Sequence, residues 1–269
     1  MSSHQLATLT TSPDIAVVQE VTSEHLDYFE NTQAYIRSKE AITKYQKINQ
    51  YIIFNPTKQN TQKIASLSPG REIKFTAESP FSTAKSDIEV NLKAHYLTLK
   101  HIVSDSPKNE ELRILHQDQI PLLGRHNLQN IAPSAVIATL LKLKPKQLAS
   151  AIASFQPLPH RLEKIATKNG ITYVNDSLAT MPDAAVSALS CFAKGSVVLL
   201  AGGHERHQDF FVLAKKIVEQ QVKTLALFPA NGERLWEAVE AELAKSRSKT
   251  PIPHSLVNSM EEALQFATK

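Results

Sequence analysis

The second half of the chain alternates short apolar runs with longer amphipathic segments, and this alternation constrains the fold more than any other feature. The apolar runs at residues 197–201, 224–228 and 255–257 are predicted strands. The segments with helical periodicity are 183–192, 210–220, 232–244 and 260–267. Because consecutive parallel strands need a crossover helix, this pattern predicts a doubly wound parallel sheet in an α/β domain.

The first half shows a similar but less regular pattern. Its predicted strands are 14–18, 51–54 and 71–76, and its predicted helices are 34–42, 128–143 and 145–155. Residues 79–119 are more polar and contain short alternating segments, which favour a small antiparallel excursion. The prolines at 157 and 159 interrupt the pattern, so we expect one domain over 1–155 and another over 156–269.

Composition narrows the class of protein. Of the 269 residues, 42% are hydrophobic and 21% are charged, which is the balance of a soluble globular protein. The net charge of +4 is spread without a basic run, so we expect no nucleic-acid partner. Cys191 is the single cysteine, and the N-terminus has no apolar leader. We therefore expect a cytoplasmic protein without membrane insertion.

Polar residues follow two of the predicted strands. Asn175-Asp176-Ser177 comes after an apolar run at 171–174, and in an open α/β sheet such residues enter the crevice at the carboxyl edge. Asp176 is then a candidate acceptor for ribose hydroxyls. An ordinary turn, with Asp or Ser capping the helix after Pro182, explains the segment as well. Gly202-Gly203 is a second such turn, and Arg206 adds charge beside it.

Gly124-Arg125-His126-Asn127 stands at the start of the long helix, where backbone amides favour an anionic or purine ligand. Asn130 lies on the same face as Asn127, so the two amides could contact an adenine edge. The alternative is that Asn127 is simply the helix N-cap. None of the seven glycines precedes Lys-Ser or Lys-Thr, so no phosphate-binding loop of the G-x-x-x-x-G-K-[ST] type is present.

Taken together, these segments resemble the Mur ligase family, and most closely its D-glutamate-adding members. The matching segments are Ser2-Ser3-His4-Gln5-Leu6, 22–27, 35–39, 124–130, 160–163, 175–180 and Gly202-Gly203. The resemblance implies a partial central ATPase-type α/β domain without its phosphate loop over 1–155. It implies part of a Rossmann-like parallel-sheet C-terminal domain over 156–269.

The resemblance also implies an activity. Mur ligases of this kind form a carbon–nitrogen bond in peptidoglycan precursor synthesis, with ATP and Mg²⁺ as cofactors. The substrates implied are UDP-N-acetylmuramoyl-L-alanine and D-glutamate. ATP converts the substrate carboxylate to an acyl phosphate, which the amine of D-glutamate attacks. The implied oligomeric state is a monomer.

Roles for individual residues follow from the same resemblance. His25 is similar to the magnesium ligand of the family, and Lys39 to its carbamylated lysine, so these two are the catalytic and metal-binding candidates. The nucleotide-binding candidates are Asn127, Asn130, Arg161 and Asp176. The substrate-binding candidates are Ser2, Gln5, Ser177, Thr180 and Arg206. The chain departs from the family pattern at His4, Leu178 and Arg206, where Phe, Lys and Lys are common.

The family pattern places a UDP-binding domain and a phosphate loop ahead of Met1, and a glutamate-binding segment after Lys269. We therefore expect a fragment that is inactive alone and turns over no ATP. The alternatives are a non-catalytic nucleotide-binding protein and a folylpolyglutamate-type ligase. A metal-dependent hydrolase built on His204 and His207 is a third, although no carboxylate or cysteine accompanies them at matching spacing.

Overall fold

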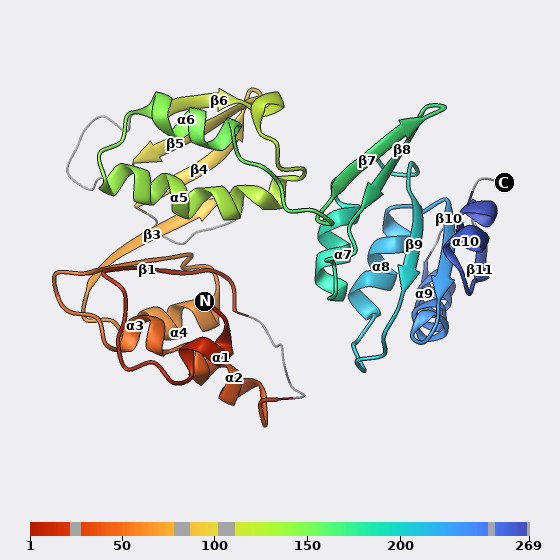
Figure 1. Ribbon diagram of the computed structural model, residues 1–269, viewed down its shortest axis with the longest axis horizontal. Coiled ribbons are helices and arrows are strands. Elements are labelled where there is room, and N and C mark those ends of the chain that lie inside the picture. Colours follow the sequence, from red (N-terminus) through yellow and green to blue (C-terminus); the bar gives the residue numbers. More distant parts are fainter. Residues whose placement is uncertain (22–27, 78–86, 102–110, 247–250, 268–269) are drawn as a thin grey trace. The chain divides into compact units, whose positions relative to one another are not determined.

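The computed structural model describes residues 1–21, 28–77, 87–101, 111–246 and 251–267 (Figure 1). The chain divides into two compact units. The first comprises Met1–Pro121 with Arg125–Phe155, and the second comprises Leu122–Gly124 with Gln156–Lys269. None of the described helices is long and apolar enough to cross a membrane.

The first unit contains a six-stranded mixed sheet whose spatial order follows the sequence. Its strands are β1 (Ile15–Val18), β2 (Tyr51–Phe54), β3 (Arg71–Ala77), β4 (Ile88–Lys93), β5 (Tyr96–His101) and β6 (Glu111–His116). Strands β1 to β4 pair in parallel, whereas β4, β5 and β6 pair antiparallel. The three early strands and the antiparallel excursion predicted from sequence are therefore confirmed.

Short helices cover this sheet. They are α1 (Ser3–Leu6), α2 (Thr32–Ser38), α3 (Ala41–Lys44), α4 (Gln59–Ala65), α5 (Leu128–Leu140) and α6 (Pro145–Ala153), with 3₁₀ turns at Gln117–Gln119 and Arg125–Asn127. The single helix predicted over 34–42 is wrong, because α2 ends at Ser38 and α3 begins at Ala41. The buried positions Ile36 and Ala41 are five residues apart, which breaks the helical period, so the chain turns between them.

Helix α5 contains Pro133, whose missing N–H leaves the carbonyl of Gln129 without an intrahelical donor. The side chain of Gln19, just after β1, donates from Nε2 to that carbonyl at 3.2 Å. The proline is therefore tolerated, because a side chain from the loop that follows β1 replaces the lost backbone hydrogen bond.

The second unit contains a three-stranded parallel sheet in the order β11-β10-β9. The helices and strands of the whole second unit are β7 (Glu163–Lys168), β8 (Ile171–Asn175), α7 (Pro182–Leu189), β9 (Val198–Gly202), α8 (Phe211–Glu219), β10 (Thr224–Phe228), α9 (Gly232–Lys245), β11 (His254–Leu256) and α10 (Met260–Ala267). Leu225 and Leu227 face the core formed with α8 and α9, whereas Ala226 packs with Ala263 of α10. Helices thus cover both faces, which confirms the predicted doubly wound sheet.

Strand β8 differs from the prediction. Residues 171–174 were expected in the open α/β sheet, but β8 pairs antiparallel with β7 in a separate two-stranded sheet. Asn169 and Gly170 connect the two strands, with φ values of +51° and +76°. An Asn-Gly pair with positive φ at both residues forms the tight turn that joins antiparallel strands, so local turn chemistry decides the pairing.

Candidate functional site

In the second unit, the loop before β7 and the loop after β8 are held together by hydrogen bonds. The backbone N–H of Leu178 donates to the carbonyl of His160 at 3.1 Å. The N–H of Leu162 donates to Asp176 Oδ1 at 3.0 Å. His160 Nδ1 and Asn175 Nδ2 lie 2.8 Å apart. The ends of the hairpin therefore form one ordered surface, although the segments are more than a dozen residues apart in sequence.

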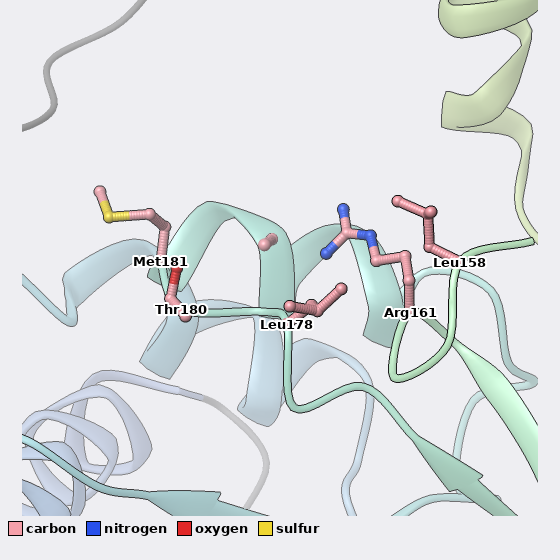
Figure 2. A pocket seen from close by; sticks show the side chains of 6 residues that line it. Leu158, Arg161, Leu178, Thr180 and Met181 are labelled. Carbon is pink, nitrogen blue, oxygen red and sulfur yellow. The ribbon is translucent and has the colours of Figure 1, made fainter. Parts of the chain in front are cut away.

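An open hollow of about 370 Å³ lies on this surface. Figure 2 shows the guanidinium of Arg161 and the hydroxyl of Thr180 beside it, with Leu178 between them. The complete lining is Leu158, Arg161, Leu178, Thr180, Met181 and Ala184. The hollow thus combines one cation and one hydroxyl with an apolar floor, which suits a small anionic ligand.

Asp176 is the most unusual polar group of this surface. Its Oδ1 accepts from Leu162 and lies 3.7 Å from Arg161 Nη1, and its side chain is 15% exposed. Its Oδ2 is buried and has no hydrogen-bond partner. The helix α7 is not capped by this residue, because its N-cap is Met181, which makes no side-chain capping bond. The capping interpretation is therefore wrong for Asp176, and a buried acceptor is left without a donor.

The charges of this surface affect the pKa of the Cys191 thiol. Burial raises the pKa of its thiol, and the negative charge of Asp176 raises that pKa further, whereas Arg161 lowers it. The thiol donates to the carbonyl of Ser187 at 3.3 Å. Cys191 therefore lies close enough to the Arg161–Asp176 pair to serve as a probe of it.

The loop between β9 and α8 approaches Thr180. Gly202 has φ of +126°, and a Cβ at this position would lie 2.3 Å from the carbonyl oxygen of Phe228, so only glycine fits. Further along the loop, Gln208 donates from Nε2 to the carbonyl of Thr180 at 3.0 Å. The loop that carries the exposed Arg206 is thereby tied to Thr180. Gln208 was not among the predicted site residues, because nothing in the sequence distinguishes one glutamine in a polar loop.

A residue of α9 holds this loop in place. Arg234 Nη1 lies 2.7 Å from Glu205 Oε1, and Nη2 donates to the carbonyl of Gln208 at 2.9 Å. The guanidinium also lies over the ring of Phe210, 5.4 Å from its centroid. The hydrogen bond from Arg234, together with one from the N–H of His207, lowers the pKa of Glu205. Arg234 was not a sequence candidate, since its role depends on partners about 30 residues away.

His204 and His207, in the same loop, belong to no cluster of metal-binding side chains among the described residues. Throughout the part of the chain that the structure describes, no three His, Cys, Asp or Glu side chains are grouped so that they could hold a metal ion. The carbonyl of His204 accepts from Asn231 Nδ2 at 3.3 Å. The local geometry therefore offers no support for a metal-dependent hydrolase built on His204 and His207.

In the first unit, Ser2 and Gln5 bind each other. The N–H of Gln5 donates to Ser2 Oγ at 3.2 Å, and the N–H of Ser2 donates to Gln5 Oε1 at 2.8 Å. This reciprocal capping box starts α1. Ser3, between them, is 2% exposed, and its Oγ is buried without a hydrogen-bond partner. The two substrate-binding candidates thus also have a local structural role.

Lys39 lies at the C-terminal end of α2 and is half-buried. Its Nζ is 5.0 Å from the ring centroid of Tyr35. His25, the proposed magnesium ligand, lies outside the described residues, with the rest of the matching segment 22–27. The structure therefore places Lys39, and the predicted pairing with His25 stays a prediction.

Asn127 and Asn130 confirm the expected shared helix face, because Asn130 Nδ2 donates to Asn127 Oδ1 at 2.8 Å. Asn127 occupies the N-cap position of α5 but makes no side-chain capping bond. The N-cap position expected for Asn127 is therefore confirmed, without a side-chain capping bond, and the two amides form a linked pair in the first unit.

Comparison with known proteins identifies relatives. The family model described as Mur ligase middle domain matches residues 1–138. The UDP-N-acetylmuramoyl-L-alanine--L-glutamate ligase of Xanthomonas oryzae pv. oryzae is 32% identical over 95% of this chain and 49% of its own length. The UDP-N-acetylmuramoylalanine--D-glutamate ligase of Clostridium kluyveri is 29% identical over 100% of this chain and 54% of its own.

A solved structure with the same fold is the MurF ligase of Thermotoga maritima in complex with ADP. It is similar with a TM-score of 0.58 and 18% identity, over 96% of this chain and 62% of that one. This likeness concerns the fold. The chain spans about half the length of the curated relatives that it matches.

Proposed function

Because the chain belongs to the Mur ligase family, we propose that it forms part of an ATP-dependent ligase that adds glutamate to UDP-N-acetylmuramoyl-L-alanine. In this reaction ATP phosphorylates the alanine carboxylate, the amine of glutamate attacks the acyl phosphate, and phosphate leaves as the amide forms. The names of the two curated relatives support this substrate pair. The observation that carries the proposal is the hollow lined by Arg161, whose guanidinium lies 3.7 Å from Asp176.

Arg161 and Asp176 fit the phosphate and ribose of a nucleotide. A guanidinium binds phosphate oxygens through charge-assisted hydrogen bonds. Oδ2 of Asp176 accepts no hydrogen bond within the chain, and a ribose hydroxyl has the donor that it lacks. This oxygen is buried, so the proposed contact requires the Asp176 side chain to rotate toward the nucleotide. Pairing would remove the cost of an unsatisfied buried oxygen. Asn127 and Asn130 are proposed for the adenine, because linked amides present both donors and acceptors to a base edge.

Thr180, Ser177 and Arg206 are proposed for the incoming glutamate. Thr180 lies beside the hollow, and Gln208 ties its backbone to the loop of Arg206. A guanidinium can bind a carboxylate with two parallel hydrogen bonds, whereas the lysine common in the family binds as a point charge. Arg206 would therefore orient a carboxylate of glutamate while Thr180 donates a hydroxyl.

Ser2, Gln5, Lys39 and His25 are proposed for the substrate carboxylate and Mg²⁺. Magnesium prefers oxygen ligands, and a carbamate on Lys39 would supply them. Among the described residues no group of three His, Cys, Asp or Glu completes such a site. The resemblance to the Mur ligase family is the reason for proposing that His25 and Lys39, as a carbamate, would hold the ion.

The enantiomer of glutamate is the finer part of the proposal. The segments His160-Arg161-Leu162-Glu163 and Asn175-Asp176-Ser177-Leu178-Ala179-Thr180 resemble those of D-glutamate ligases, so we propose D-glutamate. L-glutamate is the second candidate, because the Xanthomonas oryzae relative, at 32% identity, is named for it. Phosphate release from ATP and UDP-N-acetylmuramoyl-L-alanine, measured with each enantiomer in an enzyme containing this chain, separates the two.

Binding to the chain itself tests the proposal directly. Titration by calorimetry or ligand-observed NMR should show weak binding of ATP and of one glutamate enantiomer. Arg161→Gln should weaken ATP binding, and Arg206→Gln should weaken glutamate binding, each by about tenfold, because each removes a charge-assisted contact. Lys168→Gln, an exposed change in β7, is the matched charge control. Binding that is absent, or equally reduced by Lys168→Gln, would contradict the proposal.

A further inference from the structure

The segment that runs from the end of α5 into the first turn of α6, residues 141–147, is exposed at every position. It contains the lysines Lys142, Lys144 and Lys146. It also contains two leucines that the core does not cover, since Leu141 is 59% exposed and Leu143 is 45% exposed. We call this segment the Lys-Leu connection. In this segment the exposed leucines alternate with lysines, so apolar and positively charged side chains lie side by side at one surface.

The positive charge of this region is not compensated locally in sequence. No Asp or Glu occurs between Asp118 and Glu163, although the whole chain has 26 acidic residues. Helices α5 and α6 therefore contain no carboxylate. Among the ion pairs of the described residues, none involves the three lysines of the connection. The result is a concentrated positive charge around two exposed apolar side chains.

The backbone of the connection keeps a lysine where glycine is favoured. Lys142 has φ of +55°. Its N–H donates to the carbonyl of Thr139 at 3.0 Å, and that of Leu143 donates to Ala138 at 2.9 Å. These two bonds form a Schellman motif, in which the left-handed position is usually glycine. A lysine there is locally unfavourable, as is Gln221 at the same position after α8, so the lysine side chain is presented at a helix end that glycine would stabilise better.

We propose that the Lys-Leu connection docks on an anionic lipid surface. Lysines near a membrane are attracted to anionic headgroups, and neighbouring leucines can enter the boundary between headgroups and acyl chains. Nucleic acid fits less well, because residues 138–147 contain neither arginine nor an aromatic residue for stacking. The docking is peripheral, since it uses a loop and two side chains rather than a spanning helix.

Vesicle flotation of the purified chain tests the proposal. The chain should bind vesicles of phosphatidylcholine mixed with phosphatidylglycerol and should not bind vesicles of phosphatidylcholine alone. Raising the salt concentration should weaken binding, because exposed charges are screened. The variant Lys142→Asn, Lys144→Gln, Lys146→Gln should reduce the partition coefficient by about 100-fold, at about fivefold for each lysine.

A matched variant controls for net charge. Lys44→Gln, Lys47→Gln and Lys63→Gln remove the same charge from exposed positions elsewhere in the first unit and should leave binding within about twofold of the parent. Leu141→Ser with Leu143→Ser should reduce binding by roughly tenfold while leaving its salt dependence, because the leucines contribute apolar insertion. Circular dichroism establishes that each variant is folded.

The variant Lys142→Gly separates the effect of residue 142 on stability, through its positive φ, from its effect on vesicle binding, through its charge. It should raise Tm by a few degrees, because glycine adopts positive φ without strain, and should weaken vesicle binding by about fivefold. Absence of binding to phosphatidylglycerol vesicles would overturn the proposal. So would an equal loss in the matched lysine variant, or binding of single-stranded RNA through the same lysines without binding of vesicles.

Discussion

The parallel sheet and the β7–β8 hairpin of the second unit are stabilised in different ways. In β10 three successive residues are buried between helices, whereas β7 is exposed along nearly all of its length. The ends of the hairpin are held by hydrogen bonds involving His160, Asn175 and Asp176 instead. Close packing therefore holds the candidate residues next to the sheet in position, whereas hydrogen bonds hold those next to the hairpin.

The sharpest test of this difference is a pair of glycines at the end of β9. Gly202→Ala should destabilise the second unit by about 4 kcal/mol, because its Cβ would collide with backbone of Phe228 in the sheet. Gly203→Ala has a similar positive φ of +138° but nothing within 4 Å, so it should cost only about 1 kcal/mol. Urea denaturation of the two variants measures the difference. Equal losses would mean that the packing at β9 is not decisive.

The hairpin side is tested by Asp176. Asp176→Ala should destabilise the second unit by about 2 kcal/mol, because the N–H of the buried Leu162 loses its acceptor. Asp176→Asn retains an acceptor oxygen and should lose less than about 1 kcal/mol. Both variants should bind ATP more weakly if Asp176 contacts ribose. An unchanged urea midpoint for Asp176→Ala would show that the polar contacts do not hold the hairpin.

A third test uses pH at the Arg234–Glu205 pair. Hydrogen bonding from Arg234 holds the pKa of Glu205 below its ordinary value near 4.5 in the folded chain. The stabilising contribution is therefore present above the unfolded pKa and is lost as pH falls through the folded pKa. The parent should be more stable than Arg234→Gln at neutral pH, and the two should converge in acid. Denaturation midpoints measured across this range would contradict the assignment if the gap stayed constant.

The smallest expected effect is on the reactivity of Cys191. Burial raises the pKa of its thiol, and the charge of Asp176 raises that pKa further. Asp176→Asn should therefore accelerate alkylation by iodoacetamide at mildly alkaline pH by about twofold, because more thiolate forms. Arg161→Gln should slow the reaction, since Arg161 lowers the same pKa. If the alkylation rate changed in the same direction in both variants, the charges of Asp176 and Arg161 would not control the pKa of the thiol.

Much of the fold could be predicted from residue patterns. The parallel sheet of the second unit and the strands of the first follow from apolar periodicity, since periodicity reports which face a segment buries. The single helix predicted over 34–42 was wrong because the helical pattern was continued past the turn that follows Ser38. Only the burial of Ile36 and Ala41, which are five residues apart, showed that the helix is interrupted. The placement of β8 was wrong because the Asn169-Gly170 turn determines strand pairing more strongly than an apolar run does.

The candidate site divides in the same way. The sequence by itself determined the types of side chain at Arg161, Asp176, Thr180 and Arg206, and the glycines that let the β9 loop turn. Only the tertiary structure decided that Gln208 would bind Thr180, 28 residues away, and that Arg234 would hold the same loop. The physical reason is range: periodicity and turn chemistry act between neighbours, whereas hydrogen bonds between loops form only where packing of the whole unit brings them together.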